Sequence, residues 1–169
     1  MTKAEMEKRI TKMEQELNSL KTQLNKPEKK TGWEKPEAGQ SYWITIQCRD
    51  SFEDIWYSSC YDNVHYDNGN CFTSKELAEN ITRYQSLDLR IRRRIAEICE
   101  PVYWNEYNQE KWLLYYNHFD KDFTYSSTPY YHTNAWHFDS KENAKKIAEE
   151  FKDELIWYFT EFKDRMDTF

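Results

Sequence analysis

Apolar residues recur in alternating steps of four and three along the first 25 residues, and no other feature of the chain constrains its fold as strongly. This spacing is typical of a coiled coil. The remaining faces are polar, so the apolar seam is narrow and suits a partner helix; docking onto the chain's own body is the alternative. We therefore expect residues 1–25 to form an oligomerisation helix, dimeric or trimeric, whose seam is Met6, Ile10, Met13, Leu17, Leu20 and Leu24.

Residues 26–40 have the composition of a linker. They contain two prolines, two glycines and many charges. The helix is expected to end before Pro27, because a residue that precedes proline is pushed out of the α region. Trp33 is unusual in such a segment, and we expect it to hold the linker against the body.

From residue 41 the apolar period changes to two, which predicts strands. The first strand is expected over 41–48, with one face formed by Tyr42, Ile44, Ile46 and Cys48. A polar turn over 49–54 and a second strand over 55–60 follow. Asn68-Gly69 predicts a type I′ hairpin turn, followed by a short strand at 71–72. A capping box of Thr73 and Glu76 then predicts a helix to about residue 99. Its buried stripe is Leu77, Ile81, Tyr84, Ile91, Ile95 and Ile98.

The rest of the chain follows the same plan. Strands are expected over 111–116, 123–127 and 135–138, with a polar turn over 117–122. A second capping box lies at 139–142. It opens a helix whose stripe is Ala144, Ile147, Ala148, Phe151, Leu155, Tyr158, Phe159 and Phe162.

Several positions of the two parts correspond in order, at an offset that drifts only from 69 to 66 residues. Such agreement indicates a tandem duplication. We therefore predict an α+β fold in which the N-terminal coiled-coil helix precedes two ββ(β)α units with antiparallel strands, over 41–100 and 101–169. The matched pairs are Trp43 and Trp112, Tyr57-Ser58-Ser59 and Tyr125-Ser126-Ser127, Phe72 and Phe138, Ser74-Lys75-Glu76 and Ser140-Lys141-Glu142, and Ala78 and Ala144.

Composition favours a folded protein of the cytoplasm. Charged residues make up 32% of the chain, but seven Trp, 13 Tyr and nine Phe supply a core. No stretch is long and apolar enough for a membrane span, and the charged N-terminus has no signal-peptide core. The four cysteines form no C-x-x-C pair, so we expect free thiols. Residues 39–169 hold 15 Lys/Arg against 23 Asp/Glu, a balance that disfavours nucleic acid as a partner.

Catalytic and metal-binding motifs are not found in the sequence. The chain has three glycines and no phosphate-binding loop. His132 and His137, expected on adjacent strands, have no Cys or carboxylate at ligand spacing. We therefore expect neither an enzyme nor a metal or cofactor site.

Two groups of residues are candidates for binding. One is an arginine cluster that could meet phosphate or an acidic surface; the alternative is a solvated helix face paired with Asp88 and Glu97. The other is a set of tyrosines, a residue type that favours recognition surfaces, although packing in a sheet explains them equally well. The cluster is Arg90, Arg92, Arg93 and Arg94, and the tyrosines are Tyr57, Tyr61, Tyr66, Tyr125, Tyr130 and Tyr131.

One block of turn, cap and core residues runs through the first unit: Trp33, Pro36, Gly39, Tyr42-Trp43-Ile44, Asp62, His65-Tyr66, Gly69-Asn70-Cys71-Phe72, Ser74-Lys75-Glu76 and Ala78-Glu79. In this order the block resembles small accessory proteins encoded by phages and prophages of Gram-positive bacteria. The resemblance covers residues 1–100, covers the second unit only loosely, and carries no catalytic residues.

The resemblance implies a non-catalytic, anti-CRISPR-like anti-defence protein that binds and inhibits a host immune effector, a CRISPR nuclease being one candidate. Two alternatives remain open. The chain could be an oligomeric sponge that sequesters a nucleotide immune signal, or a nucleic-acid-binding regulator that uses the arginines.

Overall fold

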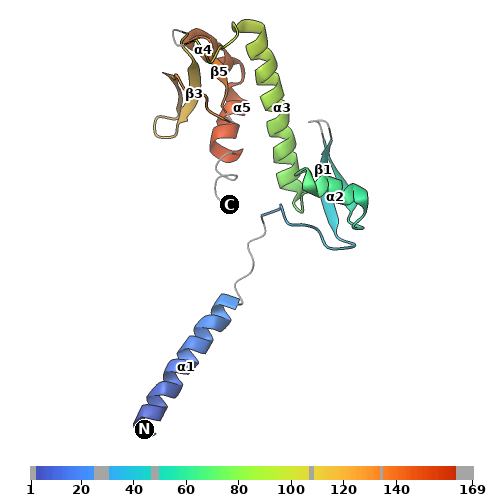
Figure 1. The fold of residues 1–169 in the computed structure, drawn as a ribbon, viewed down its shortest axis with the longest axis vertical. Coiled ribbons are helices and arrows are strands. Elements are labelled where there is room, and N and C mark those ends of the chain that lie inside the picture. The colour runs from blue at the N-terminus through green and yellow to red at the C-terminus, as the bar shows by residue number, and fades with distance from the viewer. Residues whose placement is uncertain (1–2, 25–30, 47–49, 107–108, 134, 163–169) are drawn as a thin grey trace. The chain divides into compact units, whose positions relative to one another are not determined.

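Residues 1–30 and 31–169 form two compact units, and each is described by itself. The computed structural model describes residues 3–24, 31–46, 50–106, 109–133 and 135–162 (Figure 1). The fold is α+β, as predicted, with two small antiparallel sheets in the described part of the chain, β1–β2 and β4–β3–β5. Among the described helices, none combines the length and the apolar character that crossing a bilayer requires.

The first unit contains one helix, α1 (Lys3–Leu24), where the heptad repeat predicts one. Glu5 lies in its first turn and Lys21 in its last, and both charges complement the helix dipole. Whether copies of the chain associate through α1 stays a prediction at this point.

The second unit begins with a segment that packs against the rest of this unit. Gly32 O accepts a hydrogen bond from Thr73 N at 2.8 Å, and the ring centroids of Trp33 and Phe72 lie 5.0 Å apart. Gly32 has φ +90°, and a Cβ there would lie 2.9 Å from Leu77 Cδ2. Trp33 therefore holds this segment on the body, as predicted, and the described part of the expected linker, residues 31–40, belongs to the body.

The hairpin that follows pairs β1 (Ser41–Ile46) with β2 (Asp50–Ile55). The second strand was predicted at 55–60, so this prediction is wrong by about five positions. The residues expected to turn form the strand itself, which is mostly exposed and therefore shows no apolar alternation. On the predicted face of β1, Tyr42 and Ile44 are buried and Ile46 is exposed; Cys48 lies outside the described residues.

The segment 60–67 is a helix, α2 (Cys60–Asp67), and not part of a β-hairpin. Ser59 and Asp62 form a capping box that starts it. Asn68 has φ −84°, so the predicted type I′ turn is wrong. Of the two residues Asn68 and Gly69, only Gly69 is left-handed (φ +67°). Asn70 N donates to His65 O at 2.8 Å, which is the Schellman pattern of a helix end.

A single antiparallel bridge between Trp43 and Phe72 then closes the first hairpin onto α3 (Lys75–Ile98). The cap of α3 is Ser74, whose Oγ accepts from Leu77 N at 3.3 Å, and not Thr73 as predicted. Thr73 instead donates its hydroxyl to Glu34 at 2.8 Å.

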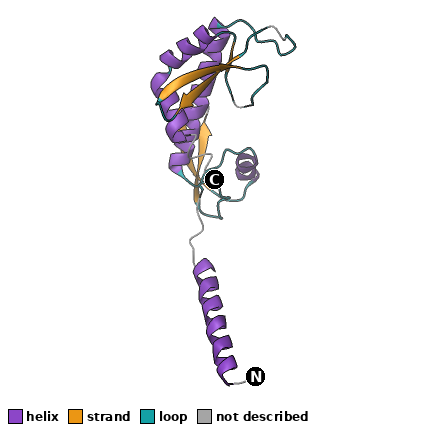
Figure 2. Cartoon of the chain, turned by 90° about the vertical axis from the view of Figure 1, so that its left-hand side faces the viewer, coloured by secondary structure: helices purple, strands orange, loops and turns teal. Residues whose placement is uncertain are grey.

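The second half contains β3 (Trp112–Asn117), β4 (Asp122–Ser127) and β5 (His137–Phe138), close to the predicted strands. The long predicted helix is divided into α4 (Lys141–Glu150), α5 (Lys152–Trp157) and the π-helical turn η1 (Tyr158–Phe162). The division falls at Phe151, which has ψ 22°. Helix α4 packs against the β4–β3–β5 sheet (Figure 2).

The predicted correspondence between the two halves holds at the Trp–Phe strand pairs and at the Ser caps, which we call the closing residues. Trp112 pairs with Phe138 as Trp43 pairs with Phe72, and Ser140 caps α4 as Ser74 caps α3. The match of 57–59 with 125–127 is wrong, because the first segment lies in the loop before α2 and the second lies inside β4.

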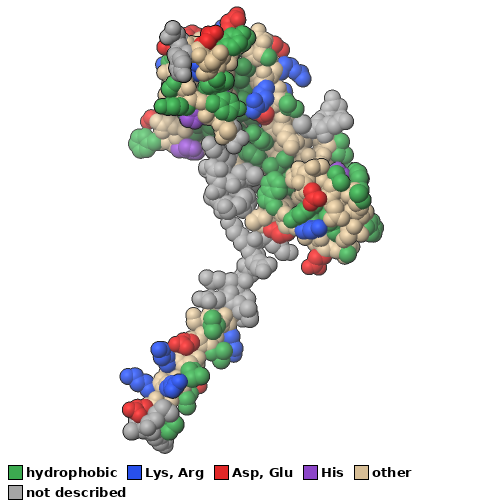
Figure 3. Space-filling model, viewed as in Figure 1, with side chains coloured by type: hydrophobic (Ala, Val, Ile, Leu, Met, Phe, Trp, Pro, Cys, Tyr) green, Lys and Arg blue, Asp and Glu red, His purple; other side chains and the backbone are tan. Residues whose placement is uncertain are grey.

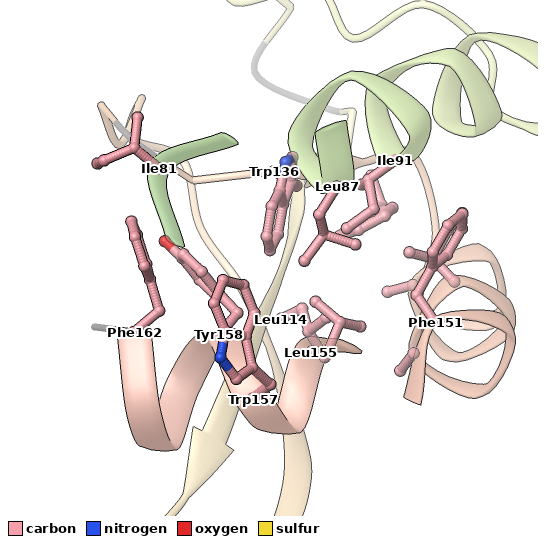
Figure 4. Packing of buried hydrophobic residues seen from close by; sticks show 14 of the residues in the cluster. Ile81, Leu87, Ile91, Leu114, Trp136, Phe151, Leu155, Trp157, Tyr158 and Phe162 are labelled. Atoms are coloured by element: carbon pink, nitrogen blue, oxygen red, sulfur yellow. The ribbon is translucent and has the colours of Figure 1, made fainter. Parts of the chain in front are cut away.

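One core joins both halves of the body. Figure 4 shows Leu87 of α3, Leu114 of β3 and Leu155 of α5 in the same cluster, and this cluster also contains Phe72 and Phe138. A second, smaller core lies under α2 and consists of Tyr42, Ile44, Trp56 and Cys71, with Tyr66 packed against it.

Candidate binding surfaces

The seam of α1 is exposed along its described length. The exposed fractions of its side chains run from 43% at Met6 to 62% at Met13. Figure 3 shows hydrophobic side chains along α1 with charged ones beside them. The other described members of the seam are Ile10, Leu17 and Leu20; the side chain of Leu24 lies outside the description.

The predicted arginine cluster lies on α3, and ion pairs occupy most of it. Arg90 binds Glu154 of α5 through both terminal nitrogens. Arg92 Nε lies 2.7 Å from Asp88, which keeps the pKa of this arginine above its ordinary value.

Arg94 continues this pattern. It lies 2.9 Å from Glu150 and 3.0 Å from Glu97, and the hydrogen bonds to both carboxylates raise its pKa. Within the described residues, Arg93 alone of the four forms no ion pair. These contacts match the helix-face interpretation, and they tie α3 to the C-terminal helices.

A pocket of about 500 Å³ lies between the first hairpin, α3 and α5. Its charges are largely balanced by its own lining, because Arg90 pairs with Glu154 and Lys75 lies 3.5 Å from Glu79. The guanidinium of Arg83 stacks on the Trp157 ring at 3.8 Å. The full lining is Trp43, Asp50, Ser51, Lys75, Glu79, Thr82, Arg83, Ser86, Arg90 and Glu154.

The six predicted tyrosines do not form one surface. Tyr57, Tyr61 and Tyr66 lie in and beside α2, near one end of α3, whereas the other three belong to the half that contains β3 and β5 (Figure 1). Tyr66 packs on Trp56 and Tyr125 packs against the main core, so both serve packing. The strongly exposed members are Tyr57, Tyr61, Tyr130 and Tyr131.

Tyr131 belongs to a cluster of aromatic rings, which together with its exposed neighbours in the sequence we call the aromatic patch. Trp104 lies at its centre, with ring centroids 5.0 Å from Tyr131 and 4.8 Å from His137. The rings in contact are Trp104, Tyr131, His132 and His137, and the exposed neighbours in the sequence are Tyr103 and Tyr130.

The aromatic patch is held by polar contacts as well as by rings. Lys111 is buried, donates to the carbonyl oxygens of Glu106 and Gln109, and places its Nζ 5.5 Å from the centre of the Trp104 ring. His132 N donates to His137 Nε2 at 3.2 Å. Burial, with the nearby charge of His132, lowers the pKa of His137, so its ring is neutral at neutral pH.

Sequence reasoning missed Trp104 and Tyr103 as surface residues, because the segment around them is irregular and has no period. The only available signal was the pair itself, two large aromatics shortly after Pro101.

A buried polar network lies under α2. Asp62 is 3% exposed and accepts hydrogen bonds from Tyr42 Oη at 2.9 Å, Tyr57 N at 3.0 Å and Ser59 N at 2.9 Å. Burial alone raises the pKa of Asp62, but these hydrogen bonds outweigh it and hold the pKa below its usual value. The network connects β1 to α2 and serves structure.

The described thiols and histidines show no arrangement typical of metal binding. In the described residues, no group of three or more His, Cys, Asp or Glu side chains could hold a metal ion. Cys60, Cys71 and Cys99 are free, and burial raises the pKa of Cys71 and of Cys99 to about 11. These two thiols therefore stay protonated at neutral pH and are poor nucleophiles.

Comparison with known proteins adds no assignment to these surfaces. No protein-family model, no curated protein and no solved structure matches the chain. The functional argument therefore depends on the surfaces themselves.

Proposed function

We propose that this chain is a self-associating, non-catalytic binding protein, in which α1 joins copies and the aromatic patch binds a partner protein. The resemblance of residues 1–100 to phage accessory proteins implies a host immune effector as this partner, with a CRISPR nuclease as the first candidate. The observation that carries the proposal is the exposed seam of α1.

The physical argument for self-association starts from the length of α1. An isolated helix of 22 residues with a polar surface is marginal in water, since most helical stability in proteins comes from packing an apolar face. Burying exposed Leu and Ile side chains contributes about 1.5–3 kcal/mol each. The seam of a second α1 helix can bury these side chains, because the apolar face of α1 is narrow and fits another helix better than a broad globular core.

The aromatic patch is the proposed partner surface because it is both exposed and held in place. Tyr130 is 73% exposed and Tyr131 is 64% exposed, while Trp104 is held by ring contacts and by Lys111. Trp and Tyr are enriched among residues that dominate binding energy, and a fixed aromatic side chain loses little entropy on binding. Joining copies through α1 would add avidity for a partner with more than one site.

Self-association is tested on the full chain by sedimentation equilibrium. Leu17→Asp places a charge in the seam, and Gln15→Asp places the same charge on the opposite side of α1. The first variant is expected to be monomeric, and the second is expected to match the natural chain. Equal masses for both variants would contradict self-association through the seam.

Anti-defence activity is tested by the plating efficiency of a targeted phage on a host that expresses a CRISPR nuclease and the chain. Tyr130→Ala/Tyr131→Ala is expected to remove the protection of the phage. Tyr57→Ala/Tyr61→Ala, a matched change near α2, is expected to keep it. If the natural chain protects no phage, the effector class is wrong; if the two double variants act alike, the aromatic patch is not the partner surface.

One further measurement tests the alternative that the chain is a nucleotide sponge. A sponge would release nucleotide from purified protein on heating, which mass spectrometry detects. Arg90, Arg92 and Arg94 are already paired with carboxylates, so phosphate would have to displace Glu154, Asp88 or Glu150. Released nucleotide in stoichiometric amount would replace the protein-inhibitor proposal with the sponge.

A further inference from the structure

Charged residues border the seam of α1 on both sides. The positions that precede the a residues hold Arg9 and Glu16, and the positions that follow the d residues hold Glu14 and Lys21. All four side chains are exposed. In coiled coils these flanking g and e positions form the ion pairs that set partner choice and orientation.

In a parallel pair of helices in register, a g side chain meets the e side chain of the next heptad on the other copy. Arg9 would then meet Glu14 of the second copy, and Glu16 would meet Lys21 of the second copy. Symmetry repeats each contact. Every flanking contact formed by these four residues therefore joins opposite charges.

An antiparallel pair changes the contacts of the two glutamates. There e positions face e positions and g positions face g positions. With the seam residues aligned over the length of the helix, Glu14 meets Glu14 and Glu16 meets Glu16. Like charges at such distances are destabilising, so this orientation is disfavoured.

We propose that α1 binds a second copy of this chain in parallel and in register, with Arg9–Glu14 and Glu16–Lys21 contacts between copies. This inference rests on the self-association proposed above and names the geometry of that surface. In a parallel coiled coil both chains leave at the same end, so residues 31–169 of both copies follow from that end. A partner with two neighbouring sites fits such an assembly.

The test is a charge exchange on the full chain, with dissociation constants measured by sedimentation equilibrium in low salt. Glu16→Lys puts two lysines at each former Glu16–Lys21 contact and is expected to weaken association about tenfold. Glu16→Lys/Lys21→Glu restores opposite charges and is expected to return to within about threefold of the natural chain. Gln15→Lys, which adds a positive charge in the middle of α1 on the side away from the seam, serves as the control.

Circular dichroism of each variant checks that α1 stays helical, because Glu16 also lies 3.9 Å from Lys12 on its own helix. High salt is expected to shrink the differences. If Glu16→Lys behaves as Gln15→Lys does and the double variant is the weaker one, the helices are antiparallel and the inference is overturned. A natural chain that is monomeric at every concentration would instead remove the self-association itself.

Discussion

The two halves of the body close in the same way and differ in what lies between the hairpin and the closing residue. In each half the first strand pairs a Trp with a Phe, and a Ser then caps the following helix. Between these fixed points the first half inserts α2 over a buried network around Asp62, whereas the second inserts the loop that carries Tyr130 and Tyr131.

This difference indicates which residues of the body can change without altering its core. Closing residues are buried in the shared core, so a change there alters both halves. The residues of the two inserts are less buried than the closing residues, and several of their aromatic side chains are exposed. The α2 insert is fixed by its own polar network, while the second insert presents Tyr130 and Tyr131 of the aromatic patch to solvent.

The largest effect is expected at the closing phenylalanines. Phe72 and Phe138 are both fully buried in the one core, so Phe72→Ala and Phe138→Ala should each cost about 3–5 kcal/mol of unfolding free energy. Because the core is shared, each variant should still unfold in a single transition in urea. Two separate transitions in either variant would show that the halves are independent domains.

A smaller effect is expected in the α2 network, which has no counterpart among the described residues of the second half. Tyr42→Phe removes the hydroxyl that donates to Asp62 at 2.9 Å and leaves the ring in place. Since hydrogen bonds to charged groups contribute about 1.5–3 kcal/mol, urea unfolding should show a loss of this size. Tyr66→Phe is the control, because its ring packs in the same small core and its hydroxyl is not among the donors to Asp62. Equal losses would mean that the hydrogen bond to Asp62 contributes no more than a tyrosine hydroxyl elsewhere in this core.

Sequence reasoning found the closing residues of both halves because they are repeated and apolar. It misplaced β2 and missed α2, and the reason is local. The segment 60–66 contains Cys, Tyr and Val, which favour strands, and Asn68-Gly69 resembles a hairpin turn. This segment forms a helix instead, because Ser59 and Asp62 make a capping box and because the Asp62 carboxylate is buried.

The aromatic patch could not be derived from the sequence for a different reason. Trp104 and His137 are far apart in the chain and meet only because β5 pairs with β3. No period connects them, so only tertiary structure brings them together. The ion pairs of Arg90 with Glu154 and of Arg94 with Glu150 are of the same kind.

Acid is expected to affect the segment docked on the first half. Hydrogen bonds from the Thr31 backbone and from Thr73 lower the pKa of Glu34 to about 2 from an ordinary 4.5. The folded-state pKa is depressed, so the stability from Glu34 is complete above pH 4.5 and is lost as the pH falls toward 2. Melting temperatures of the natural chain and Glu34→Gln should therefore differ at neutral pH and converge in acid. A constant difference across this range would contradict the assignment.

The smallest effect is expected at the lysines that follow the two caps, and it tests the repeat most directly. Lys75 Nζ lies 5.2 Å from the centre of the Trp43 ring, and Lys141 Nζ lies 5.8 Å from the centre of the Trp112 ring. Exposed contacts of this kind contribute about 0.5–1 kcal/mol, so Lys75→Met and Lys141→Met should each lose that amount in urea unfolding. Lys145→Met, an exposed lysine of α4, is the control. A loss at both sites but not at the control would mean that the two halves share an energetic contact as well as a pattern, whereas a loss at one site alone would mean that they differ in energy even where their geometry agrees.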